Sequence, residues 1–246
     1  MGRLRPHRRG PGARRRDADV RPRLTGSRGR WPRPLNWRSR AADRPRTIVS
    51  MPTTDVDLRA RIVAGAISAY RAGDFHRVGP DEVAEHAGVT ADEFHRAYPM
   101  WELLVVAVMD KWNNGSRLEL WPIAERDGTV AYLRARLAAG VEDPALVRLR
   151  VAVLSAASNP DHPAAGWFRT QYTRAFEDVT LALVRDVVAG RESRGASPRH
   201  AAEQLMALYE GLQLQSVIRD DGEPLSAFDR AVARMRVGWA AARVDA

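Results

Sequence analysis

The chain has 246 residues, no cysteine and a formal net charge of +9 at pH 7. This length is enough to bury a core in one large domain or two small ones. The lack of cysteine excludes disulfides, thiol catalysis and cysteine-ligated metal sites. The longest apolar run, Leu103–Met109, is far too short to span a bilayer. The composition therefore predicts a soluble protein, most simply a cytoplasmic one.

The positive charge is concentrated at the start of the chain. Residues 1–50 contain 16 Arg and 3 Asp, whereas residues 51–246 have a net charge of −4. The first segment is rich in Arg, Pro and Gly, and it has too few apolar residues to offset the entropy lost on folding, so we expect a disordered extension. Two interpretations stay open: a basic arm that grips DNA phosphates, or translated upstream sequence with the true start at Met51. The regular pattern that begins after Met51 favours the second.

From Thr54 onward the pattern is helical. Apolar residues recur at spacings of three and four, and no alternation long enough for a strand is present, so the predicted fold class is all-α. The first helix is expected to begin at Thr54 or Asp55 and to end near Gly73. Breaks are expected at clusters of Gly, Pro, Asp and Asn such as Asn113-Asn114-Gly115. The later long helices are expected at Met100–Asn113, Gly128–Ala139, Pro144–Ala157, Pro163–Ala189, Pro198–Arg219 and Pro224–Ala242.

Two short helices joined by a tight turn are predicted by the segment GPDEVAEHAGVTADEFHRAY, which begins at Gly79. Ala84 is small enough to allow a close helix crossing, and Gly88 can adopt the positive φ that the turn needs. Thr90 and Glu93 have the spacing of a capping box at the start of the second helix. These features describe a helix-turn-helix, in which the helix Ala91–Ala97 would lie in the major groove of DNA.

A wider set of residues shares this pattern: Arg61–Tyr70, Gly73, Val83-Ala84, Ala87-Gly88-Val89, Phe94, Tyr98-Pro99, Glu102 and Leu104. Through them, residues 56–104 resemble the DNA-binding domain of the TetR family of transcriptional regulators. The sequence ALYEGLQL at Ala207–Leu214 resembles the dimer helix of betaine-regulator-type C-terminal domains in that family. The resemblance implies a three-helix DNA-binding domain at 51–102, followed at 103–246 by a helical bundle that dimerises and holds a ligand.

The resemblance also implies which residues contact DNA. Backbone amides at helix N-termini can bind phosphates, and polar side chains of the second short helix can reach base edges. A homodimer would read a pseudo-palindromic operator in double-stranded DNA. The expected DNA-binding residues are Gly79, Thr90, Ala91, Asp92, Glu93, His95, Arg96 and Trp101.

The charge of this segment favours an alternative. Residues 51–102 carry five arginines and nine acidic residues, whereas DNA affinity comes largely from neutralising phosphates. Asp92 can also pair with Arg96 four residues later, which would occupy the one arginine of the recognition helix. The alternative is a ligand- or protein-binding module of the same fold, whose degenerate recognition helix does not bind DNA specifically.

Two apolar stripes near the C-terminus predict a homodimer. Amphipathic helices of this kind can form an isologous four-helix interface between two copies of a chain. The other interpretation is that both stripes face the core of the same chain. The stripes consist of Ala201, Leu205, Leu208 and Leu212 on the first helix and of Phe228, Val232, Met235 and Trp239 on the second.

Six aromatic residues of the C-terminal region, together with a methionine and a glutamine, are candidates for the wall of a ligand pocket. A pocket of this composition would suit a small apolar ligand, which the sequence does not identify. Ordinary core packing is the other interpretation. The candidates are Trp121, Trp167, Phe168, Tyr172, Phe176, Met206, Tyr209 and Gln213.

Nothing in the sequence indicates an enzyme. It contains no Gly-x-Ser-x-Gly, no phosphate-binding glycine loop and no His-Glu-x-x-His, and no two of its six histidines lie four residues apart. No cofactor or metal site is therefore expected. The sequence predicts a homodimeric all-α transcriptional regulator, most simply a repressor released by a small molecule.

Overall fold

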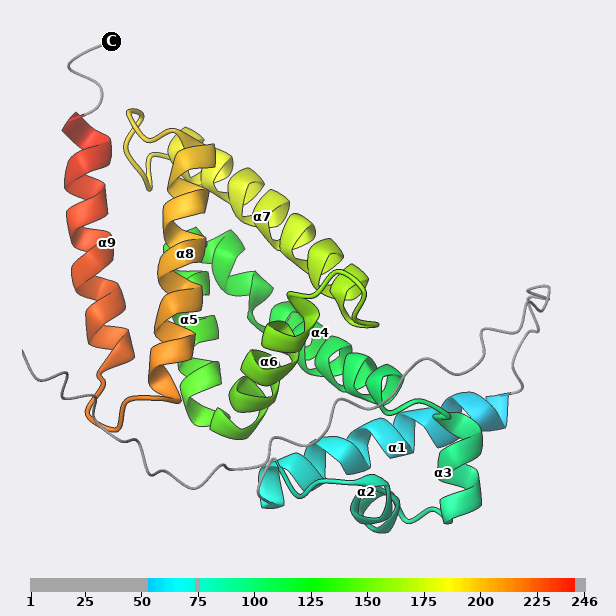
Figure 1. Cartoon of the computed structure of the whole chain (residues 1–246). Coiled ribbons are helices and arrows are strands. Elements are labelled where there is room, and N and C mark those ends of the chain that lie inside the picture. The colour runs from blue at the N-terminus through cyan, green and yellow to red at the C-terminus, as the bar shows by residue number, and fades with distance from the viewer. Residues whose placement is uncertain (1–52, 74–75, 242–246) are drawn as a thin grey trace, which may run out of the picture. The chain divides into compact units, whose positions relative to one another are not determined.

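The structure is a computed structural model that describes residues 53–73 and 76–241, and all the regular elements in this part of the chain are helices (Figure 1). The expectation of an all-α fold is confirmed. The predictions for residues 1–50 lie outside the described residues. Across the described ranges, no helix is both long and apolar enough to cross a membrane. The helices are α1 Thr53–Ala72, α2 Pro80–Ala87, α3 Ala91–Ala97, α4 Trp101–Arg126, α5 Thr129–Glu142, α6 Pro144–Ala157, α7 Ala165–Val188, α8 Pro198–Ser216 and α9 Pro224–Ala241.

Helices α1, α2 and α3 pack around one apolar cluster that also takes in the start of α4. Ile62 of α1, Val83 of α2 and Phe94 of α3 are almost fully buried in it. The cluster depends on a close approach of two helices. A Cβ at Gly65 on α1 would lie only 2.6 Å from the backbone nitrogen of Ala87 on α2. Glycine at this position therefore lets the two helix backbones touch.

Helix α4 corrects the sequence-based boundaries. A break was expected at Asn113-Asn114-Gly115, but the helix continues to Arg126. Asn113 is held by tertiary contacts, since its Oδ1 accepts a hydrogen bond from Arg136 of α5 at 2.8 Å and its Nδ2 donates to Gln171 of α7 at 3.3 Å. These contacts outweigh the weak helix propensity of Asn and Gly. The result is a 26-residue helix that runs from the α1–α3 unit into the C-terminal bundle.

In the C-terminal bundle, α8 packs against α5, α7 and α9 (Figure 1). The two C-terminal apolar stripes form the core here, which corrects their assignment to a dimer interface. Each helix uses its apolar stripe to close the bundle of its own chain, because hydrophobic periodicity shows which face is apolar but not what covers it. Buried are Ala201, Leu205, Leu212, Phe228, Val232 and Trp239, while Leu208 and Met235 are partly buried against the same cluster.

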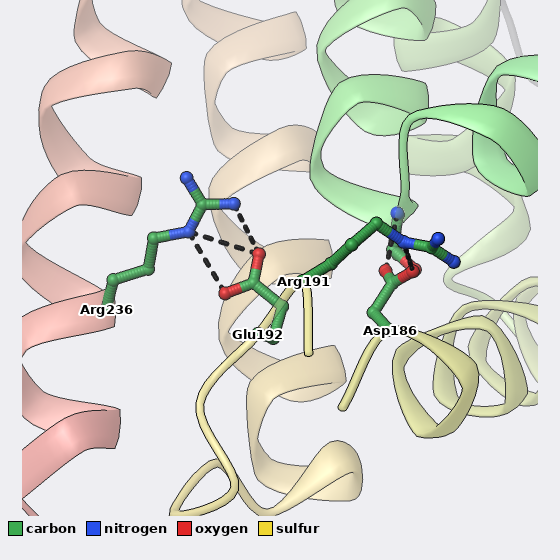
Figure 2. A network of polar contacts seen from close by, with 5 residues as sticks. Asp186, Arg191, Glu192 and Arg236 are labelled. Carbon is green, nitrogen blue, oxygen red and sulfur yellow. Dashed lines mark hydrogen bonds and ion pairs between the residues drawn. The ribbon is translucent and has the colours of Figure 1, made fainter. Parts of the chain in front are cut away.

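Charged side chains at the end of α7 and in the loop that follows it form hydrogen bonds with neighbouring helices (Figure 2). Asp186 is 1% exposed, and its carboxylate accepts hydrogen bonds from the backbone N–H of Thr129 at 2.7 Å and from Nε of Arg191 at 2.8 Å. It thereby caps the N-terminus of α5 from a distant part of the chain. Glu192 in the same loop accepts hydrogen bonds from Arg236 of α9. The contact between Glu192 and Arg236 thus joins α9 to the loop that follows α7.

Candidate DNA-contacting surface and ligand cavity

The turn between α2 and α3 has the geometry that the sequence predicts. Gly88 ends α2 with a φ of 62°, in the left-handed region that suits glycine. Thr90 then caps α3, because its Oγ1 accepts a hydrogen bond from the backbone N–H of Glu93 at 3.2 Å. The Glu93 carboxylate accepts in return from the backbone N–H of Thr90 at 2.9 Å. The predicted capping box is therefore present.

Helix α3 has one buried face and one exposed face. Phe94, Ala97 and Tyr98 are anchored in the core. Of the expected DNA-binding residues on this helix, four are exposed to solvent. They are Ala91, Asp92, His95 and Arg96.

The Arg96 guanidinium does not pair with the carboxylate of Asp92 on the same helix. Asp92 and Arg96 are both within the described ranges, and no ion pair forms between them there. The pairing that the spacing allowed is thus absent. Arg96 remains available to a phosphate or to the edge of a base.

Other expected DNA-binding residues have structural partners of their own. The hydrogen bond from the Thr90 backbone N–H holds the pKa of Glu93 below its usual range. At neutral pH the Glu93 carboxylate is therefore charged, and it is hydrogen-bonded to Thr90. Trp101 is half-buried, with its ring centroid 6.5 Å from that of Phe94. Gly79 is half-exposed as the N-cap of α2, where its backbone can approach a phosphate.

A cavity lies among α4, α5, α6, α7 and α8. The structure brings five of the eight expected pocket residues together there: Trp167, Phe168, Tyr172, Met206 and Tyr209.

The remaining three expected pocket residues do not line this cavity. Trp121 packs edge-on against Tyr132 with ring centroids 5.2 Å apart, and Phe176 is part of the apolar core. Gln213 is buried, with its Oε1 3.4 Å from Nη1 of Arg150. These side chains support the wall of the cavity or the core next to it.

The cavity is more polar than the sequence indicates. Three arginines line it, and two of them pair with carboxylates that also line it: Arg117 with Asp178 at 3.3 Å, and Arg150 with Glu210 at 2.7 Å. The third is Arg136. The pocket predicted from the sequence contained no charged residue, so the expectation of an apolar ligand did not include these arginines and carboxylates.

A signal for Arg136 was nevertheless present in the sequence. It follows Tyr132 and Leu133 by four and three residues, so it interrupts the apolar face of a predicted helix. A charged residue on such a face needs a partner inside the fold.

Two tyrosines add hydroxyl groups to the cavity. Burial raises the pKa of Tyr209 above its ordinary value. The pKa of Tyr172 is also raised, mainly by burial and to a smaller extent by the negative charge of Glu210. Both phenols therefore keep their protons at neutral pH and can donate a hydrogen bond. The cavity thus combines an apolar body with several hydrogen-bonding groups and paired charges.

Comparisons with known proteins agree with this arrangement. Residues 125–237 match the family model of the BetI-type transcriptional repressor C-terminal domain. A TetR transcription regulator from Haloarcula marismortui is 15% identical and has a TM-score of 0.64, and the match covers 74% of this chain and 98% of that one. Residues 125–237 are thus similar to BetI-type C-terminal domains, and the described helices have the fold of solved TetR-family regulators. The resemblance inferred from the sequence is confirmed.

Other solved structures share the TetR-family fold. A TetR-family regulator from Streptomyces coelicolor is 18% identical with a TM-score of 0.57, over 75% of this chain and 97% of that one. The regulator FadR from Bacillus subtilis, in complex with stearoyl-CoA, is 10% identical with a TM-score of 0.59, over 73% and 98%. Among curated proteins, no sequence matches the chain. At these identities the solved structures establish the fold.

Proposed function

We propose that this protein is a transcriptional regulator of the TetR type: a cytoplasmic, homodimeric repressor that binds an operator in double-stranded DNA and is released by a small molecule. The observation that carries the proposal is the exposed face of α3. His95 and Arg96 point polar groups outward, while Phe94 and Tyr98 fix the helix to the core. A helix held in this way can enter the major groove without losing its own packing.

The polar groups of α3 and its cap also suit base recognition. Arg96 can donate to guanine, and Asp92 can accept from the amino group of cytosine. The first turns of α2 and α3 add backbone N–H groups for phosphates. These contacts offset in part the acidic composition of residues 51–102.

We assign the dimer contact to the outward faces of α7, α8 and α9 in place of the buried stripes. Ala207, Gly211 and Leu214 follow one another at helical spacing along α8, and the first and last are exposed while the glycine is half-exposed. Val188 on α7 and Val237 on α9 are also exposed, and both helices pack against α8. Small residues on α8 would let the same helix of a second copy approach closely.

The position of α4 supports a release mechanism. Leu104 and Val105, near its start, pack in the same cluster as α1, α2 and α3. Further along, Met109 and Trp112 line the cavity. A ligand that favours one position of α4 over another would change the separation of the two α3 helices in a dimer. The solved complex of FadR with stearoyl-CoA supports a small-molecule ligand for a protein of this fold.

The proposal is tested by fluorescence anisotropy with the DNA upstream of the protein's own gene, over a range of salt concentrations. The full chain and residues 51–246 are compared. We expect both to bind this DNA in preference to a scrambled fragment. Binding by the full chain alone, with a steep salt dependence and no sequence preference, would favour the alternative of a ligand- or protein-binding module, which the acidic charge of residues 51–102 supports.

A further inference from the structure

Arg136 projects from α5 into the cavity wall, where neutral groups surround its guanidinium. Nη2 donates to Oδ1 of Asn113 at 2.8 Å, and Nη1 donates to the Tyr132 hydroxyl at 3.3 Å. The guanidinium carbon lies 5.9 Å from the ring centroid of Tyr132 and 5.8 Å from that of Tyr209. Nε is buried and has no hydrogen-bond partner. The guanidinium therefore still has an unused donor.

The other charges of the cavity are compensated. Arg150 pairs with Glu210 and Arg117 with Asp178, whereas no carboxylate of the described residues lies within ion-pair distance of Arg136. A sequestered cation without a counter-charge is unfavourable, and a bound anion removes that cost. The described side chains thus leave the cavity with one uncompensated positive charge.

We propose that the cavity binds a small monocarboxylate with an apolar body, whose carboxylate pairs with Arg136. This inference rests on the proposed function, because it names the chemical class of the molecule that releases the repressor. One free positive charge matches one negative charge, and a guanidinium suits a planar carboxylate particularly well. Trp167, Phe168 and Met206 supply the apolar surface for the rest of the ligand.

The size of the cavity limits the ligand. Its free volume is about 60 Å³, which is less than an aromatic ring needs. Met109 and Met206 line it, and the unbranched side chain of methionine readily adopts other rotamers. A ligand as large as benzoate would displace one of these side chains. This movement reaches α4 and α8 directly, since Met109 and Met206 belong to those helices.

The test compares acids with neutral molecules of the same shape. Benzoate and benzamide, and octanoate and octanamide, are titrated into the full-length protein at pH 7 and followed by calorimetry and by tryptophan fluorescence, to which Trp112 and Trp167 contribute. We expect at least one acid to bind tenfold or more tightly than its amide. Arg136→Gln should remove this preference. Arg134→Gln, two residues away on an exposed ion pair with Asp229, is the matched control and should keep it.

Three outcomes of this test would overturn the inference. Amides that bind as tightly as their acids, no binding by either acid, or an unchanged preference in Arg136→Gln would each do so. If Arg136→Gln fails to fold, the comparison of acid with amide in the unmodified protein decides by itself.

DNA binding is measured on the same samples without ligand. Binding of DNA without binding of any acid overturns this inference and leaves the proposed function standing. Binding of an acid without binding of DNA supports the carboxylate site and overturns the proposed function as a repressor.

Discussion

Arg71, in the last turn of α1, forms an ion pair with Asp143 at the junction of α5 and α6, with Nη2 2.7 Å from Oδ2. The same carboxylate oxygen accepts a hydrogen bond from Nε1 of Trp112 on α4, at 3.1 Å. Trp112 is part of the cavity wall. One carboxylate therefore connects the cavity to the first helix of the proposed DNA-binding unit.

This connection predicts that Asp143→Asn weakens the response to ligand. Coupling between sites is typically about 1–3 kcal/mol, or roughly 5- to 150-fold in affinity. We expect the variant to bind ligand almost as the unmodified protein does but to lose most of the ligand-induced drop in DNA affinity. DNA affinity is measured by fluorescence anisotropy, with and without an acid that has been found to bind the cavity. Asp127→Asn, which breaks an exposed pair with Arg126, is the control. An unchanged ligand-induced drop in DNA affinity in Asp143→Asn would exclude coupling through this carboxylate.

Gly65→Ala should destabilise the α1–α2 contact. The added methyl would lie 2.6 Å from the backbone nitrogen of Ala87, so two helix backbones would have to separate. Overpacking of this kind costs about 1–3 kcal/mol. The free energy of unfolding in urea measures it. Gly115→Ala is the matched control, because nothing lies within 4 Å of a Cβ there. The control should be neutral or more stable by up to about 1 kcal/mol, since alanine favours a helix interior. Equal stability of the two variants would contradict the close approach.

The capping box predicts a pH-dependent effect of Glu93→Gln. The folded protein lowers the pKa of Glu93, so the charged carboxylate stabilises the fold above its ordinary pKa and stops doing so as the pH falls through the lowered value. Glutamine keeps the acceptor but not the charge. The melting temperature of Glu93→Gln should therefore be lower than that of the unmodified protein at pH 7. The difference should disappear in acid below the ordinary range of a glutamate. A difference that stays constant down to pH 3 would show that charge is not the cause.

Arg96→Ala and His95→Ala should weaken binding to the upstream DNA. A base-edge contact contributes about 1–3 kcal/mol, and loss of a phosphate contact lowers the slope of log affinity against log salt by about 1. Anisotropy titrations at several salt concentrations separate the two roles for Arg96. Arg148→Ala removes an exposed arginine of α6 and should leave both affinity and slope unchanged. Unchanged affinity in both α3 variants would refute the role assigned to this helix.

Leu214→Glu should convert the proposed dimer to a monomer. The side chain is 41% exposed on the outward face of α8, so a glutamate is tolerated by the isolated chain but would be buried without a partner in the dimer. Analytical ultracentrifugation of the full chain measures the change. Leu118→Glu alters a leucine on α4 that is 66% exposed, and it should leave the dimer intact. A dimeric Leu214→Glu protein would place the interface elsewhere.

Features that depend on local chemistry could be predicted from the amino-acid sequence. The turn at Gly88 and the capping box of Thr90 and Glu93 were predicted at their observed positions, because a positive φ and a reciprocal cap depend on residues that are close in sequence. The bounds of α6, Pro144–Ala157, were also predicted, with proline at the first helical position.

Contacts between distant parts of the chain determine what covers each helix face and which arginine of the cavity has no carboxylate partner. The apolar stripes of α8 and α9 could have faced a second copy, but they close the core of their own chain. Asn113 predicts a helix break by its local propensity, but hydrogen bonds with Arg136 and Gln171 hold it within α4. Arg136 itself became a candidate ligand contact only when the carboxylates of the cavity proved to be paired elsewhere. Such contacts join residues that are distant in sequence, and periodicity along one helix carries no information about which helix lies opposite.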